Sequence, residues 1–212
     1  MKYWQKRFLK TASVFLLFFG IIAGVYFWYM EEQGNFHPIT PGEAYRSAQL
    51  DQDELGYYIR KFGIRSIINL RGRHDGECWY TKEIAICLKF GIKHYDLGLH
   101  SDKEPTSHNI QELLRLFDTT PRPVLIHCKA GADRAGLAAA IWQVVIEGRP
   151  KSEAKRQLSF VYGHMPFGRV QALDAFLEKW VIPKKTIISN EEMTGGLLST
   201  EDLIKVGKRV ES

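Results

Sequence analysis

A cysteine and an arginine with five residues between them lie within the string His-Cys-Lys-Ala-Gly-Ala-Asp-Arg-Ala-Gly at residues 127–136. The thiolate of a cysteine is a nucleophile, and a guanidinium is a planar fork that matches two phosphate oxygens. Cys128 and Arg134 at this spacing, with Gly131 between them, indicate a loop that holds a phosphate group against a nucleophile.

The segments on either side of this loop predict how it is positioned. Residues 123–126 are apolar and predict a short buried strand, whereas residues 134–147 are Ala-rich and predict a helix. A loop that leads into a helix collects unpaired N–H groups and the positive end of the helix dipole, so it binds anions and favours thiolate over thiol. We therefore expect Cys128 to be an ionised nucleophile. The alternative, a buried structural thiol, leaves Gly131 and Arg134 unexplained. The expected phosphate-binding residues are Lys129, Ala130, Gly131, Ala132, Asp133 and Arg134.

Cleavage of a phosphoester also needs a proton for the leaving oxygen. Asp102 lies between a predicted strand at residues 94–97 and a predicted helix at residues 110–118, so we expect it at the same sheet edge as Cys128. We predict that Asp102 is the general acid. Glu104 is the next candidate and Asp75 is a weaker one, and the alternative for Asp102 is a solvated loop carboxylate.

Three residues beside Cys128 are interpreted separately. Lys129 either raises the positive potential around phosphate or extends into solvent. Asp133 repels an anion unless it points away, so we expect it to pair with Arg71, Arg73 or a helix-end amide. For His127 we predict a bridging hydrogen bond rather than proton transfer.

Strands alternate with helices along the chain, which predicts an α/β fold with a central, mostly parallel sheet of four to five strands flanked by helices. The Cys128 loop then lies at the carboxyl edge of the sheet, where such folds bind ligands. The predicted domain covers residues 31–182, and residues 183–212 are interpreted as a mobile tail with a short amphipathic helix at residues 199–206. The predicted strands are residues 44–47, 66–70, 94–97 and 123–126; the predicted helices are residues 51–62, 77–90, 110–118, 134–147, 152–162 and 169–180.

Residues 11–30 contain no charged side chain, and 20 residues at about 1.5 Å each span a hydrocarbon core of about 30 Å. Four basic residues precede this segment and Glu31 and Glu32 follow it, so residues 1–10 are predicted to be cytoplasmic and the domain extracytoplasmic, anchored in the inner membrane. A cleaved signal peptide is the alternative, but the segment ends in bulky aromatics rather than a small-residue cleavage site.

The net charge of +5 comes mostly from those four basic residues, which argues against a nucleic-acid-binding surface. The chain has 3 cysteines, too few for a disulfide framework or a structural zinc site. We expect Cys78 and Cys87 to be unlinked thiols on one helix.

The string His-Cys-x5-Arg, with its strand, glycine and helix, resembles the signature of the protein tyrosine and dual-specificity phosphatases. The resemblance covers residues 35–180 and is most similar to small membrane-linked or periplasmic phosphatases of Gram-negative bacteria. It implies hydrolysis through a thiophosphoryl-cysteine intermediate, without metal or cofactor, and an acid on the loop of Asp102. Ala135 departs from the pattern, because Ser or Thr commonly follows the arginine there; we expect slower release of phosphate from the enzyme. The matching strings are Tyr45-Arg46-Ser47-Ala48-Gln49, Ile68-Asn69-Leu70-Arg71-Gly72, Gln157-Leu158-Ser159 and Tyr162-Gly163-His164.

The expected substrate is phosphotyrosine in proteins, with phosphoserine and phosphothreonine as further candidates. A lipid or inositol phosphate phosphatase is the second interpretation, which Lys129 favours and Ala132 disfavours because a second loop lysine is lacking. A non-catalytic phosphate-binding module is a third, although a binder needs no Cys128. Sulfur transfer of the rhodanese type uses a loop that is usually one residue shorter.

Overall fold

The computed structural model describes residues 2–182, and the predicted tail and its helix lie outside the described residues. A five-stranded sheet has the order β1-β2-β5-β3-β4, in which β1 is antiparallel to β2 and all other neighbours are parallel. The predicted α/β class and mostly parallel sheet are confirmed. The strands are β1 (His37–Thr40), β2 (Ala44–Ser47), β3 (Ser66–Asn69), β4 (Lys93–Asp96) and β5 (Val124–His127).

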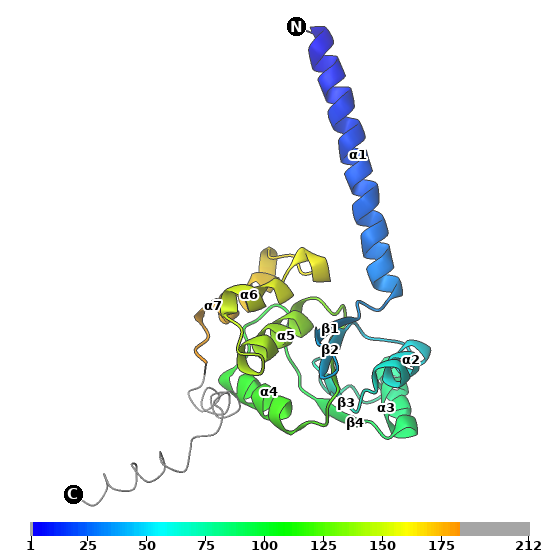
Figure 1. Ribbon diagram of the computed structural model, residues 1–212, viewed down its shortest axis with the longest axis vertical. Coiled ribbons are helices and arrows are strands. Elements are labelled where there is room, and N and C mark those ends of the chain that lie inside the picture. Colours follow the sequence, from blue (N-terminus) through cyan, green and yellow to red (C-terminus); the bar gives the residue numbers. More distant parts are fainter. Residues whose placement is uncertain (1, 183–212) are drawn as a thin grey trace, which may run out of the picture.

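Helices cover both faces of the sheet (Figure 1). On one face lie α2 (Gln52–Phe62) and α3 (Cys78–Phe90). On the other lie α4 (Ser107–Thr119), α5 (Asp133–Val145), α6 (Lys151–Ala154) and α7 (Gln171–Lys179). Short 3-10 turns, η1 (Lys155–Gln157), η2 (Phe160–Tyr162) and η3 (Gly168–Val170), connect α6 to α7.

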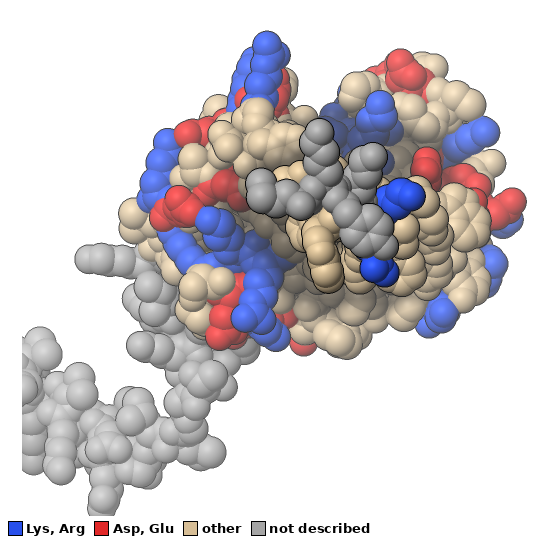
Figure 2. Space-filling model, turned by 90° about the horizontal axis from the view of Figure 1, so that it is seen from above, with Lys and Arg blue, Asp and Glu red and all other residues tan. Residues whose placement is uncertain are grey.

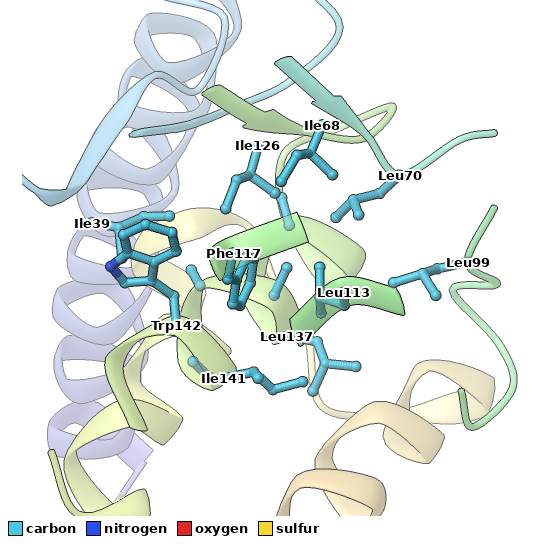
Figure 3. Close-up of a cluster of buried hydrophobic side chains, with 14 of the residues drawn as sticks. Ile39, Ile68, Leu70, Leu99, Leu113, Phe117, Ile126, Leu137, Ile141 and Trp142 are labelled. Atoms are coloured by element: carbon cyan, nitrogen blue, oxygen red, sulfur yellow. The ribbon is translucent and has the colours of Figure 1, made fainter. Parts of the chain in front are cut away.

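Successive side chains of the strands enter two separate cores, as the alternation of a pleated strand requires. Ile126 and Ile68 pack with the α4 and α5 side, where Phe117, Leu137 and Trp142 fill the larger core (Figure 3). The smaller core lies under α2 and α3 and contains Tyr45, Ile67, Leu125, Leu55 and Ile86. Between these layers β5 is completely buried, so the residue that follows it, Cys128, starts from a rigid position.

Two features of the fold differ from the sequence prediction. Strand β1 was not predicted, because Pro38 reads as a breaker; an edge strand tolerates proline, which lacks an N–H to donate. Residues 152–162 do not form one helix, since α6 ends at Ala154 and Ser159 has an extended backbone (φ −147°). The chain therefore turns back toward the Cys128 loop between α6 and η2.

Helix α1 (Lys2–Glu32) projects from the domain (Figure 1). Its portion Arg7–Glu32 is long and apolar enough to cross a membrane. Its end contacts the domain, because the Tyr26 hydroxyl donates to the Val161 carbonyl at 2.6 Å and Met30 is buried.

Candidate active site

The predicted phosphate loop lies at the carboxyl end of the central strand β5 and leads directly into α5. Cys128 is buried there, with only 2% of its surface exposed, and its N–H donates to the Ser47 carbonyl at 3.4 Å. The predicted strand, loop and helix are thus all present. Cys128 starts the loop and Arg134 lies in the first turn of the helix, so the same short segment connects them.

Gly131 is the residue that allows the loop to turn. Its φ of +72° lies in the left-handed region, which favours glycine. A Cβ atom at this position would lie 2.7 Å from the Ala48 backbone nitrogen and 2.8 Å from the Ser47 carbonyl carbon. The loop can therefore adopt this shape against β2 only with glycine at residue 131.

Arg46 is completely buried behind the loop and holds it from the inside. One terminal nitrogen, Nη2, donates to the carbonyls of Gly131 (2.6 Å) and Ala132 (3.0 Å). The other, Nη1, donates to the carbonyl (2.8 Å) and side-chain oxygen (2.7 Å) of Gln157. Burial lowers the pKa of Arg46 to about 10, although Cys128, Tyr162 and Asp133 oppose that shift. The side chain therefore stays charged at neutral pH and places a buried cation near Cys128.

The two preceding loop carbonyls also have partners. The Lys129 carbonyl accepts from the Gln49 N–H at 3.1 Å, and the Ala130 carbonyl accepts from Asn35 Nδ2 at 2.9 Å. Together with Arg46, these contacts bind the carbonyls of all four residues 129–132 to the surrounding protein. Because carbonyls held toward the protein leave N–H groups free for the opposite side, this arrangement suits an anion.

Arg134 is held at one end of its guanidinium. Nη1 donates to the carbonyls of Leu70 (3.5 Å) and Leu99 (3.4 Å), while Nε is buried and has no hydrogen-bond partner among residues 2–182. Burial and the nearby positive charge of Arg134 lower the pKa of Arg71. The guanidinium of Arg71 stacks on the Trp79 ring, with its central carbon 3.4 Å from the ring centroid. An anion near Cys128 would thus meet an unsatisfied donor of Arg134 and a second cation.

His127 lies in a buried group of side chains around Glu83, where neither of its ring nitrogens has the geometry of a hydrogen bond to a partner among residues 2–182, so its bridging role stays a prediction. Its Nε2 lies 3.2 Å from Glu83 Oε1, which accepts from His94 Nε2 at 2.8 Å. Gln49 donates to the other oxygen of Glu83 at 2.5 Å. Burial alone would raise the pKa of Glu83, but His127, His94 and Gln49 together hold it well below its usual range. A buried carboxylate on α3 thus lies against the histidine that precedes Cys128.

Asp133 points away from the anion site, toward a buried histidine. Its Oδ1 lies 2.7 Å from His164 Nδ1, and the other ring nitrogen of His164 lies 2.9 Å from Asp174 Oδ2. The two arginines among the expected partners bond elsewhere: Arg73 pairs with Asp75, and Arg71 contacts Gln49. Burial alone would lower the pKa of His164, but the hydrogen bonds to Asp133 and Asp174 raise it. The charge of Asp133 is thus directed away from a bound anion.

The three candidate acids have different surroundings. Glu104 pairs with Lys179 at 2.6 Å, and Asp75 pairs with Arg73 at 2.8 Å. Asp102 is half-buried and makes no hydrogen bond or ion pair within the part of the chain that the structure describes. The contact of Arg134 with the Leu99 carbonyl brings the start of the Asp102 loop to the phosphate loop. Glu104 lies on the same loop, so what distinguishes Asp102 from it is a carboxylate that is not already paired with a cation among the described residues.

The other residues singled out in the sequence differ in their exposure to solvent. Lys129 and Ala130 are exposed, whereas Ala132 and Ala135 are buried. The structure leaves Cys78 exposed and Cys87 buried, and both are free thiols. Burial raises the pKa of the Cys87 thiol to about 12, which disfavours its thiolate form.

Sequence reasoning missed the residues that hold the loop in place. They are Asn35, Arg46, Gln157, His164 and Asp174. A signal was present for three of them, because Arg46, Gln157 and His164 stand in the strings that carry the family resemblance. No local pattern gives such residues a role, since each acts across a large sequence separation.

A family model described as a DSP-PTPase phosphatase fused to NAD+ kinase matches residues 31–168, more than half of the chain. The chain belongs to this phosphatase family. Curated relatives include the inositol diphosphatase SIW14 of Saccharomyces cerevisiae, 32% identical over 48% of this chain and 36% of that protein. Another is the dual specificity protein phosphatase TpbA of Pseudomonas aeruginosa, 24% identical over 58% of this chain and 53% of that protein. The chain spans about half or less of the length of these relatives.

Solved structures of the same phosphatases share the fold. The core catalytic domain of the S. cerevisiae SIW14 phosphatase aligns with a TM-score of 0.61 at 19% identity, covering 78% of this chain and 96% of that one. The crystal structure of P. aeruginosa TpbA aligns with a TM-score of 0.56 at 21% identity, covering 69% of this chain and 85% of that one. At these identities the likeness concerns the fold alone.

Proposed function

We propose that the protein is a cysteine-dependent phosphatase that hydrolyses phosphotyrosine, and also phosphoserine or phosphothreonine, in protein substrates. The observation that supports this proposal is the loop between the buried Cys128 and Arg134, in which the four carbonyls of residues 129–132 are all bound from behind. A cradle fixed before substrate arrives stabilises the charge of the transferring phosphoryl group without reorganising during the reaction.

In the proposed reaction the Cys128 sulfur attacks phosphorus and the bond to the leaving oxygen breaks. Asp102 donates its proton to that oxygen, while Arg134 and the N–H groups of residues 129–134 bind the equatorial oxygens. Water then attacks the thiophosphoryl intermediate, and the Asp102 carboxylate accepts the proton of the water. The sulfur–phosphorus bond breaks, which restores the thiolate and releases phosphate.

We further propose that α1 anchors the enzyme in the inner membrane and that the catalytic domain is extracytoplasmic. The length and composition of Arg7–Glu32 support a membrane span. Basic residues precede the apolar stretch and Glu31 and Glu32 follow it, which supports the orientation. Resistance to carbonate extraction tests the anchor. The orientation is tested with intact inside-out vesicles of the inner membrane, in which an extracytoplasmic domain lies in the lumen and is protected from added protease.

The enzyme activity is tested by release of p-nitrophenol from p-nitrophenyl phosphate. We expect Cys128→Ser to abolish release, and Cys78→Ser, the matched change at an exposed thiol, to leave it unaltered. Activity that survives Cys128→Ser would contradict the proposed nucleophile. Trapping of radioactive phosphate on the protein, lost in Cys128→Ser, identifies the covalent intermediate.

Inositol or lipid phosphates are a second candidate substrate class, because a relative at 32% identity is named an inositol diphosphatase and Lys129 is exposed in the loop. The buried Ala132 offers no second cation in the loop for a polyanionic ring. Side-by-side kcat/KM values for phosphotyrosine peptides, inositol phosphates and phosphatidylglycerol phosphate decide between the classes. A preference for the inositol compounds would replace our primary proposal.

A further inference from the structure

A short apolar segment, residues 160–167, lies on the domain surface beside the end of α1. Its large side chains are exposed, with exposed fractions of 56% for Phe160, 57% for Val161 and 61% for Phe167. Met165 is partly exposed as well. Clustered aromatic and aliphatic side chains on a surface mark a site that contacts another apolar phase or protein. We call residues 160–167 the docking segment.

The docking segment is attached to α1 within the apolar part of that helix. The Tyr26 hydroxyl donates to the Val161 carbonyl at 2.6 Å. Met30 is the last residue of the uncharged stretch, and Tyr26 comes four positions before it. Along a helix, four residues separate Tyr26 from Met30 by about 6 Å. Figure 1 shows the yellow segment before α7 on the side of the domain from which α1 leaves. A bilayer that surrounds α1 up to Met30 therefore reaches Val161.

We propose that the docking segment inserts into the interfacial layer of the same bilayer that α1 crosses. The inference rests on the membrane anchor proposed above. Phe160, Val161 and Phe167 would enter the boundary between headgroups and acyl chains, at the depth where Tyr26 and Trp28 of α1 also settle. The domain would then have two contacts with the membrane and a fixed orientation, rather than hanging from a single helix.

Two exposed arginines flank the docking segment, whereas the acidic side chains that contact it, Asp133 and Asp174, are both paired with His164. Residues 154–173 contain no Asp or Glu, and the exposed Arg156 and Arg169 lie on either side of the docking segment. Figure 2 looks down onto the molecule from the end that carries α1, where basic side chains in blue and acidic side chains in red are mixed with uncharged surface. Each basic residue near an anionic membrane adds attraction that salt screens. Glu31 and Glu32, exposed at the end of α1, offset part of this attraction, so the apolar side chains carry the proposed contact.

The docking segment also touches the back of the phosphate loop. Asn35 Nδ2 donates both to the Ala130 carbonyl and to the Tyr162 carbonyl, at 2.9 and 3.0 Å. A side chain placed on Gly163 would lie 3.7 Å from Ala132 Cβ and 3.8 Å from Met30 Cε. Because α1 joins the sheet at the edge that carries Cys128, docking would hold the catalytic edge close to the membrane surface. The enzyme would accordingly prefer phosphate groups presented near that surface.

Photocrosslinking of the full-length chain in nanodiscs of phosphatidylcholine and phosphatidylglycerol tests the docking. The photoreactive residue p-benzoylphenylalanine replaces Phe160, Phe167 or, as the control, Leu88, an exposed apolar residue of α3. We expect lipid adducts at positions 160 and 167 and none at 88. Equal yields at the three positions, or none at any of them, would overturn the docking.

The crosslinking result does not depend on catalysis, so it separates failure of the docking from failure of the proposed phosphatase activity. Carbonate extraction of the same full-length chain from membranes shows whether α1 is an anchor. If the chain is extracted, the anchor fails and the docking fails with it.

A paired variant, Phe160→Asp with Phe167→Asp, links the docking to catalysis. We expect a several-fold loss of turnover on a lipid-tethered phosphotyrosine peptide in the nanodisc and no change with soluble p-nitrophenyl phosphate. Leu88→Asp is the control and should change neither rate. Equal losses on both substrates would mean that the docking segment serves only to stabilise the phosphate loop, and would overturn the membrane role.

Discussion

The two loops that meet at Arg134 are attached to the protein in opposite ways. The phosphate loop is bound along its whole length, since each carbonyl of residues 129–132 has a partner and Arg46 is buried behind it. The loop between β4 and α4 carries Asp102, which has no partner among the described residues, and Glu104, whose pairing with Lys179 is exposed to solvent.

This difference matches the separate demands of the two chemical roles. A cradle for a charged transition state gains from being fixed, because no free energy is then spent on orienting dipoles during the reaction. A general acid must approach the leaving oxygen and later admit water, which a loosely attached loop allows. The predictions below test this contrast by weakening the fixed loop, the acid loop and their supports in turn.

Removal of the buried cation should have the largest effect. Arg46→Ala leaves the carbonyls of Gly131, Ala132 and Gln157 without donors, and we expect it to lower the free energy of unfolding by about 3–5 kcal/mol. Urea denaturation measures this loss. The exposed Arg65→Ala is the matched control and should stay within about 0.5 kcal/mol of the parent. A similar effect of both substitutions would show that the loop is not held by Arg46.

Removal of the proposed acid should reduce catalysis but not stability. We expect Asp102→Asn to lower kcat for aryl phosphates with poor leaving groups by about 10²–10⁴-fold, and much less for p-nitrophenyl phosphate, whose leaving group needs little protonation. The dependence of kcat on leaving-group basicity measures this effect. Glu104→Gln is the control on the same loop. If Glu104→Gln gives the larger loss, the acid has been assigned to the wrong residue.

The third expected effect is a pH dependence of stability from the pairing of Asp133, His164 and Asp174. The pKa of His164 is raised above 6.5 in the folded protein. The contribution of the charged imidazole to the free energy of unfolding is therefore complete below pH 6.5, and it is lost as the pH rises through the raised pKa. Hydrogen bonds to a charged group contribute about 1.5–3 kcal/mol each. Urea midpoints from about pH 6 to about pH 9 should fall more in the parent than in His164→Gln. Parallel curves would contradict a charged His164.

The smallest expected effect concerns Ala135, which is completely buried after Arg134. Ala135→Ser restores a hydroxyl that can hydrogen-bond the departing thiolate, a bond worth about 0.5–1.5 kcal/mol, and should raise the rate of dephosphorylation about two- to tenfold. Burst and steady-state phases with p-nitrophenyl phosphate separate this step from phosphorylation. Ala138→Ser, one turn further along α5, is the control. An unchanged steady state would remove Ala135 as the cause of slow turnover.

Local patterns were sufficient to predict most of the fold and the strand, loop and helix that carry Cys128 and Arg134. The apolar run before His127, the glycine at residue 131 and the Ala-rich run after Arg134 predict the strand, loop and helix, because each depends on neighbours within a few residues. Strands β2, β3, β4 and β5 and the helices α2 to α5 follow from the same kind of signal. Local patterns did not predict β1, because an edge position tolerates its proline. They predicted one helix at residues 152–162, where the chain instead turns back after α6.

Long-range contacts decided what the sequence by itself could not. Arg46 reaches the loop across 85 residues of sequence, Asn35 across 95, and His164 reaches Asp133 across 31, and no periodicity records such separations. Burial gives these contacts their effect, since a polar group away from water must find its partners within the protein. The sequence by itself determined that a thiol and a guanidinium share one strand–helix loop. The tertiary structure alone decided how the loop is held, where the charge of Asp133 is directed, and that the apolar residues 160–167 lie against the end of α1.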